Sequence, residues 1–299
     1  MQVFYSDHFI VPLPAGHRFP IQKYALLRQE LLRQGILTPE ELRPALPVDL
    51  QALMLAHTPE YVHAVIDGAL DPHIERQIGL PWSPALVQRS LASVGGTLAA
   101  ARQALRDGIA GNLAGGTHHA SASEGAGFCV FNDLAVASLA LLQSAQARRL
   151  AVIDLDVHQG NGTAAILGGR REVFLFSLHS QNNYPVRKVP SDLDIGLPDR
   201  CGDEDYLAAV ERGLAAVLTF RPELIFFQAG VDVLAEDRLG RLALSMDGLA
   251  RRDRLVLAAC RDERIPVAVV MGGGYADPID RTVQAHVQTY HVARQLFTA

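Results

Sequence analysis

Two carboxylates and an imidazole stand at alternate positions in the run Asp154-Leu-Asp156-Val-His158. In an extended segment alternate side chains share one face, so the spacing predicts that all three point the same way. A buried carboxylate is costly unless it is paired or bound to a metal. The run therefore indicates a metal or acid–base site, although taken alone it is equally typical of a strand end whose polar residues face solvent.

Two adjacent histidines, His118 and His119, follow the glycines Gly115 and Gly116. Paired imidazoles supply an acid, a base and electrostatic assistance near neutral pH, and the glycines permit a tight backbone path. The alternative is a pair of loop histidines satisfied by backbone carbonyls.

Two further residues extend this set. Asp232, in Gln-Ala-Gly-Val-Asp, could join Asp156 and His158 as a third metal ligand and leave one coordination position for water. Taken alone, it fits a helix N-cap or a turn better. Tyr275 follows three glycines and could donate its hydroxyl to a developing oxyanion. Its alternative is an aromatic residue on a surface loop.

These residues must be positioned by the elements before them, and short apolar runs alternate with longer helical patterns. The expected strands are Val3–Tyr5, Gly111–Ala114, Leu150–Leu155, Val173–Leu178, Leu224–Gln228 and Val267–Met271. The expected helices are Ser83–Leu105, Asn132–Gln146, Glu204–Phe220, Asp247–Asp262 and Asp280–Leu296. Strands that are apolar on both faces predict an α/β fold with an open, mostly parallel sheet flanked by helices on both faces.

The chemically capable residues follow directly after four of the expected strands, those that end near Ala114, Leu155, Gln228 and Met271. In open α/β sheets, ligands bind beyond the carboxyl ends of the strands. We therefore expect four distant segments to converge on one crevice.

The composition disfavours several other classes of protein. The formal charge of −5 and the lack of a basic patch interleaved with aromatics disfavour nucleic-acid binding. No run is long enough to cross a bilayer, and the N-terminus does not resemble a signal peptide. Three scattered cysteines favour a reducing compartment, so we expect a cytoplasmic protein formed by a single domain over residues 1–299. The sequence does not define an oligomeric state.

Six motifs together resemble the histone deacetylase family, and they occur in that family's order. They are GGTHHA (115–120), GFCVFND (127–133), DLDVHQGNGT (154–163), SLH (177–179), QAGVD (228–232) and GGGY (272–275). Within the family the chain looks most similar to class IV and its bacterial relatives. Gln159 and Asn161 stand where class I members carry His and Asp, and the stretch 182–199 also looks class IV-like.

The resemblance implies a single-domain fold of the arginase and deacetylase type and one role for each matching residue. Asp156, His158 and Asp232 would bind one Zn²⁺. His119 would act as general base and then as general acid, while His118 stays mainly electrostatic and is oriented by Asp154. Tyr275 would polarise the scissile carbonyl, and Gly127, Phe128 and Gly273 would line the tunnel for the acyl-lysine. A structural K⁺ is implied at main-chain oxygens of Asp154, Asp156 and His158, with Ser177 and Leu178.

Asn161 departs from most of the family, in which an aspartate lies behind the second histidine. A neutral amide favours the imidazolium less than a carboxylate does. The hypothesis is that the pKa of His119 is lowered, so that it stays a neutral base down to lower pH.

The expected activity is zinc-dependent removal of acetyl or longer acyl groups from lysine side chains in proteins. One alternative is an acetylpolyamine or another small acyl-amine as substrate. A second is a catalytically silent acyl-amine binding protein. A third is a ureohydrolase of the arginase type, which binds two Mn²⁺ and needs further carboxylates, whereas Leu234 stands two residues after Asp232.

Overall fold

Eight parallel strands form one open sheet within residues 1–297, the part of the chain that the computed structural model describes. The spatial order is β2-β1-β3-β8-β7-β4-β5-β6, and every neighbouring pair is parallel. The strands are β1 (Gln2–Tyr5), β2 (Leu42–Pro44), β3 (Ile109–Asn112), β4 (Leu150–Asp154), β5 (Val173–Ser180), β6 (Leu193–Leu197), β7 (Leu224–Gln228) and β8 (Val267–Val270).

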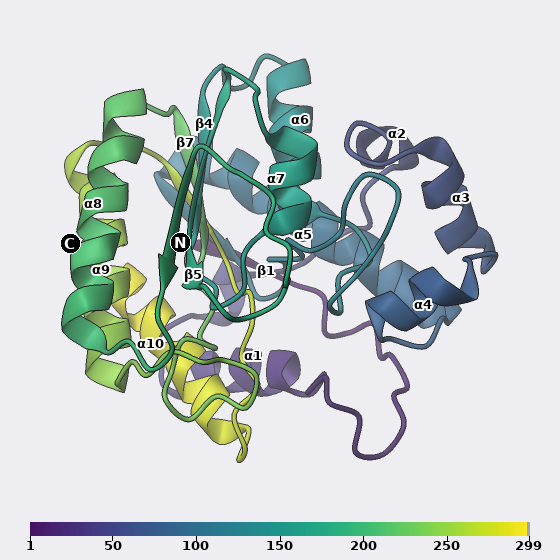
Figure 1. Ribbon diagram of the computed structural model, residues 1–299, viewed down its shortest axis with the longest axis horizontal. Coiled ribbons are helices and arrows are strands. Elements are labelled where there is room, and N and C mark those ends of the chain that lie inside the picture. Colours follow the sequence, from purple (N-terminus) through teal and green to yellow (C-terminus); the bar gives the residue numbers. More distant parts are fainter. Residues whose placement is uncertain (298–299) are drawn as a thin grey trace.

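Helices cover both faces of this sheet, as the sequence predicts for strands that are apolar on both sides. They are α1 (Lys23–Arg33), α2 (Leu50–Leu53), α3 (Pro59–Asp67), α4 (Pro72–Ile78), α5 (Pro84–Asp107), α6 (Asp133–Gln143), α7 (Asn161–Leu167), α8 (Asp203–Phe220), α9 (Met246–Asp262) and α10 (Asp280–Phe297). Figure 1 shows α8 and α9 on one side of the strands and α5, α6 and α7 on the other, with α2, α3 and α4 farther out.

The two faces of the sheet belong to two hydrophobic clusters, and β4 contributes to both. Leu150 and Val152 pack in the cluster that contains α5 and α6, whereas Ala151 and Ile153 pack in the cluster that contains α8 and α9. This alternation follows from the two-residue period of a strand. The expected fold class is therefore confirmed.

The sequence located the central strands well and the edges poorly. The strand expected at Gly111–Ala114 begins and ends two residues earlier, at Ile109–Asn112. Neither β2 nor β6 was expected, because β2 has only three residues and β6 alternates partly buried and exposed side chains at the sheet's edge. The helices α1 to α4 and α7 were also not predicted, since four of them have at most nine residues.

Four consecutive strands of the sheet, β3, β8, β7 and β4, are those whose carboxyl ends precede the candidate residues. Asp154, the last residue of β4, is in register with Gln228 at the end of β7 and with Ser177 of β5. Since the strands are parallel, the segments that follow them lie at the same edge of the sheet.

Among the helices of the described residues, none combines the length and the apolar character that a membrane crossing requires.

Candidate metal centre

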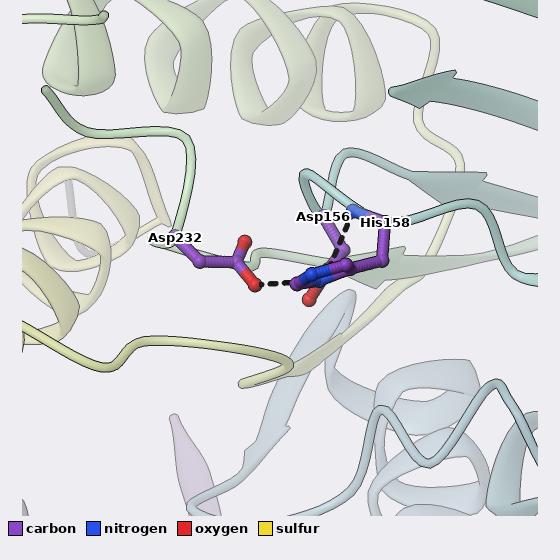
Figure 2. A group of neighbouring side chains, drawn as sticks. All are labelled: Asp156, His158 and Asp232. Carbon is purple, nitrogen blue, oxygen red and sulfur yellow. Dashed lines mark hydrogen bonds and ion pairs between the residues drawn. The ribbon is translucent and has the colours of Figure 1, made fainter. Parts of the chain in front are cut away.

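Asp156, His158 and Asp232 lie together beyond the ends of β4 and β7, as Figure 2 shows. One potential ligand atom from each residue lies within 4.8 Å of the other two. The Nδ1 atom of His158 is 3.0 Å from Oδ1 of Asp156 and 3.2 Å from Oδ2 of Asp232. Two segments 75 residues apart in the chain therefore place two carboxylates and an imidazole around one point.

The alternation of an extended strand is not what brings these side chains together, contrary to the expectation from the Asp154–His158 spacing. The strand β4 ends at Asp154, and the chain bends immediately after it. The bend is held by side-chain oxygens, because Oδ1 of Asp154 accepts from the amide of Asp156 and Oδ1 of Asp156 accepts from the amide of His158. Such local bonds are typical of aspartate at turns.

The cluster is buried and strongly negative, so a positive charge nearby is needed to stabilise it. Burial and the neighbouring Asp156 carboxylate raise the pKa of Asp232 to about 7. Burial alone would lower the pKa of His158, but hydrogen bonds to Asp156 and Asp232 raise it to about 10. Either a proton on the His158 imidazole or a bound cation would balance this negative charge. A cation would do so while all three ligands are deprotonated.

The surrounding backbone admits nothing larger than glycine at two positions. A Cβ atom on Gly273 would lie 1.9 Å from Oδ2 of Asp232, and one on Gly230 would lie 2.6 Å from Oδ2 of Asp156. The amide of Gly273 donates to Oδ2 of Asp156. Oδ2 of Asp232 is buried, with Nδ1 of His158 3.2 Å away and no further hydrogen-bond donor among the described residues. The donor set of one nitrogen and carboxylate oxygens, with a position left open, fits Zn²⁺.

The two histidines differ in their partners. Nδ1 of His118 lies 2.7 Å from Oδ2 of Asp154, whereas Nδ1 of His119 lies 2.7 Å from Oδ1 of Asn161, the first residue of α7. The Asn161 oxygen can only accept, so the neutral His119 ring carries its proton on Nδ1 and leaves Nε2 free to accept one.

These environments push the two pKa values apart. Burial opposes the charged form of His118, but the Asp154 and Asp156 carboxylates raise its pKa. Burial and the charges of His118 and His158 hold the pKa of His119 well below its usual value. The pair is therefore suited to one cationic member and one neutral base.

A buried aspartate that the sequence analysis did not single out holds the histidine loop. Asp133, at the start of α6, accepts hydrogen bonds from the amides of Gly116 and Thr117 and from the Thr117 hydroxyl. Gly115 and Gly116 have φ angles of 81° and 73°, which favour glycine. The GFCVFND motif contained Asp133, but only the folded chain shows that its carboxylate faces the loop.

Tyr275, Phe128 and Gly127 line one pocket together with both histidines, Asp156, His158 and Gly273. The Phe128 and Tyr275 rings lie with centroids 6.0 Å apart. A Cβ atom on Gly127 would lie 2.6 Å from Cδ2 of His119, so glycine lets the chain pass the ring. Burial and the Asp232 and Asp156 carboxylates raise the pKa of Tyr275 well above its usual value, which keeps its hydroxyl protonated and able to donate.

Two residues beside this pocket were not predicted. The Tyr184 ring packs edge-on against the His119 ring at 4.8 Å, from within the 182–199 stretch noted in the sequence. The buried Lys23 ammonium lies 3.4 Å from the carbonyl oxygens of Gly272 and Gly274, and 5.0 Å from the centre of the Tyr275 ring. No motif marked Lys23, and the noted stretch gave no role to Tyr184.

The remaining candidates lie on β5, next to β4. Ser177 pairs with Asp154 in the sheet, and its hydroxyl lies 3.0 Å from Nδ1 of His179. Leu178 is fully buried. The strand pairing thus keeps Ser177 and Leu178 beside the Asp154–His158 bend.

Comparison with known proteins places these features in a family. The histone deacetylase domain matches residues 17–290. An uncharacterized protein of Picosynechococcus sp. is 46% identical over 99% of both chains. Histone deacetylase 2 of Arabidopsis thaliana is 29% identical over 91% of this chain and 73% of that protein. Crystal structures of an HDAC homolog complexed with SAHA and of an HDAC homolog from Aquifex aeolicus superpose with TM-scores of 0.82 and 0.80, each at 23% identity. They match 98% of this chain, and the matches cover 84% and 83% of their own chains.

Replacing Gly273 by alanine should weaken metal binding, because the new methyl group would collide with the Asp232 carboxylate. We expect the dissociation constant for Zn²⁺ to rise ~10–100-fold, the range seen when the partners of metal ligands are disturbed. Competition with a chromophoric chelator measures it. Gly202→Ala is the matched control, since nothing lies within 4 Å of a Cβ there. Equal Zn²⁺ affinity in the two variants would contradict the assigned site.

Proposed function

We propose that this chain, which belongs to the histone deacetylase family of hydrolases, is a zinc-dependent deacylase that acts on acyl-lysine side chains in proteins. The observation that carries the proposal is the convergence of Asp156, His158 and Asp232 on one point, beside the pocket that Asp156 and His158 line together with His118, His119 and Tyr275.

One Zn²⁺ per chain fits the three ligands, and it would supply Lewis-acid activation of the acyl carbonyl and of a water. Among residues 1–297, Asp156, His158 and Asp232 are the one set of histidine, cysteine and acidic side chains grouped closely enough to hold an ion. This favours a single-metal deacylase over a ureohydrolase with two Mn²⁺.

His119 is proposed as the proton-transferring residue. Its free Nε2 takes a proton from the attacking water as the new C–O bond forms, and it later gives that proton to the leaving amine nitrogen as the C–N bond breaks. His118, held by Asp154, stays cationic and stabilises the negative charge that develops on the substrate. The products are a carboxylate and an ammonium ion, since the amine also takes up the second proton of the water, so atoms and charge balance with one water consumed.

Tyr275 is proposed to donate its hydroxyl to the oxyanion of the tetrahedral intermediate. Its main-chain amide is fixed by Oδ2 of Asp237 at 2.7 Å, and the Lys23 ammonium holds the carbonyls of the preceding glycines. A donor positioned in advance costs little reorganisation during the reaction, which is what makes oxyanion stabilisation effective. Phe128 and Gly127, and across from them Tyr184, would form the walls around the substrate's methylene chain.

The charge near the pocket favours a protein substrate over a polyamine. A surface pocket that adjoins Tyr275 is lined by Arg18 and Arg238, and its one carboxylate, Asp277, pairs with Arg238 at 3.6 Å. A polycationic chain would meet like charge there, whereas a lysine in a polypeptide carries a neutral backbone.

A second, largely apolar pocket supports acyl groups longer than acetyl. It shares Phe19, Tyr24, Gly115, Thr117 and Phe128 with the site pocket. Its further walls include Leu80, Leu86, Val130 and Phe131. A pocket of this kind would take the apolar end of a long acyl chain beyond the scissile carbonyl.

Other parts of the proposal rest on the family resemblance together with local contacts. A structural K⁺ would be held by main-chain oxygens of Asp154, Asp156 and His158, with Ser177 and Leu178, and Asp154 and Ser177 line one small pocket. For class IV membership, the support is that the Gln159 side chain bonds Val189 and Asp194, which lie in the class IV-like stretch 182–199.

The domain and location are proposed on similar grounds. Residues 1–299 are proposed to act as one catalytic domain, since the family match spans residues 17–290. A cytoplasmic location agrees with the three buried free cysteines.

Testing the purified, zinc-loaded protein against acetyl-lysine, myristoyl-lysine and acetylpolyamine substrates checks the proposed function directly. We expect hydrolysis of the lysine substrates in preference to the polyamine. Binding without turnover of any of the three would favour the silent binding protein.

Tyr275→Phe should lower kcat by roughly 100- to 1,000-fold, because one oxyanion donor is lost. Zinc content, measured by metal analysis, should stay at the parent's level because Tyr275 is not a ligand. Undiminished turnover in this variant would refute the role of the hydroxyl.

Asn161→Asp should move the acidic limb of the kcat/KM profile to higher pH by about one unit or more. A carboxylate beside Nδ1 favours the imidazolium, so the pKa of His119 rises and the neutral base is lost at a higher pH than in the parent. An unmoved acidic limb would exclude His119 as the titrating base.

Leu86→Phe should reduce the myristoyl-to-acetyl ratio of kcat/KM by roughly tenfold, because the larger ring fills the second pocket. Activity on the acetyl substrate is the internal control, since an acetyl group does not extend into that pocket. A parallel fall on both substrates would mean that the pocket does not receive the acyl chain.

A further inference from the structure

A fully buried arginine on α9 reaches the backbone that carries the metal ligands. Arg252 donates from its Nη1 atom to the carbonyl oxygens of Gly230 at 2.5 Å and of Leu155 at 3.5 Å. Its side chain is 0% exposed, and it is not among the residues that line the site pocket. The guanidinium thus touches the site only through main-chain atoms.

The two carbonyls belong to the two segments that must meet at the metal. Leu155 directly precedes Asp156, and Gly230 lies two residues before Asp232. Gly230 also packs closely on Asp156, since a Cβ atom there would lie 2.8 Å from the Asp156 Cα atom. One guanidinium nitrogen therefore links the ends of β4 and β7 where the two carboxylates, which repel each other, have to stay close.

The guanidinium itself is held from three helices. Asp253, its neighbour on α9, pairs with Arg252 at 2.7 Å, and the other Asp253 oxygen accepts from Thr289 of α10. The hydroxyl of Tyr206, on α8, donates to the same Leu155 carbonyl. A buried charge is tolerated only with such partners. Adjacent residues of a helix do not normally face each other, so the pairing of Arg252 with its neighbour Asp253 is unusual. The arrangement thus keeps the arginine head beneath one defined pair of carbonyls.

The sequence contains a signal for this burial. Arg252 lies three residues after Leu249 and four before Val256, both fully buried, so helical spacing puts it on the inner face of α9. Its neighbour Arg251 lies on the outer face, where it pairs with Glu204 at the surface.

We propose that Arg252 is a positioning residue that sets the separation of the Asp156 and Asp232 segments and thereby the affinity of the chain for its divalent cation. The inference rests on the metal site of the proposed function. It assigns to Arg252 no contact with substrate, water or ion.

The test is the Zn²⁺ dissociation constant of Arg252→Lys, measured by chelator competition on the metal-free protein. Lysine keeps the positive charge but has a single ammonium that cannot pair with Asp253 and span both carbonyls in the same geometry. We expect the dissociation constant to rise ~10-fold. In the zinc-saturated enzyme, kcat should fall while KM stays within about twofold of the parent, since the pocket walls are untouched. Arg251→Lys is the matched control and should bind zinc as the parent does.

Asp253→Asn provides a second variant in case Arg252→Lys does not fold. It keeps the guanidinium but removes the charge that orients it, and a ~3-fold or greater rise in the zinc dissociation constant is expected, with the melting temperature of the metal-free protein recorded alongside. A folded variant that binds zinc as tightly as the parent overturns the inference. If the parent itself binds no Zn²⁺, the proposed function fails before the variants are compared.

Discussion

The repulsion between two buried carboxylates, Asp156 and Asp232, is the constraint around which this part of the molecule is organised. Each carboxylate comes from a different strand end, and the backbone passes close to both, at Gly230 beside Asp156 and at Gly273 beside Asp232. Burying either carboxylate without a partner would cost several kcal/mol in desolvation, on the order of the penalties known for buried charges. The local backbone offsets part of this cost through amide donors, from Val157 to Asp232 and from Gly273 to Asp156.

Aspartates away from the metal centre give the loops their shape. Asp133 holds the histidine loop, Asp154 orients His118, and Asp237 binds the amides of Leu239, Gly240 and Tyr275. Each of these carboxylates accepts from backbone amides, Asp154 from that of Asp156, and so replaces hydrogen bonds that the backbone loses on leaving the sheet. The site is thus a set of irregular segments that owe their order to charge-assisted bonds from buried acids.

The sequence predicted the centre of this architecture better than its periphery. The strands β4 and β7 were recognisable because their residues are apolar on both faces of the sheet, as Val152 and Ile153 are in β4. The edge strand β6 lacks that pattern, because its outward residues are exposed. The candidate residues could be named because they follow strand ends, but the bend that joins Asp156 to His158 depends on side-chain bonds that spacing does not encode. No motif marks Lys23, and the helical spacing that puts Arg252 on the inner face of α9 does not show which carbonyls its guanidinium contacts.

Phe128 occupies a left-handed backbone conformation, with φ at 66°, and this has a consequence for protein engineering. Its amide donates to the carbonyl oxygen of Ile78, the last residue of α4, and Gly79 packs against its ring. A branched residue such as valine or isoleucine at position 128 would be strained whatever its size. Anyone who wishes to reshape this wall would therefore have more freedom at Phe19, whose ring centroid lies 5.1 Å from that of Phe128, than at position 128 itself or at Gly79, which also has a positive φ of 71°.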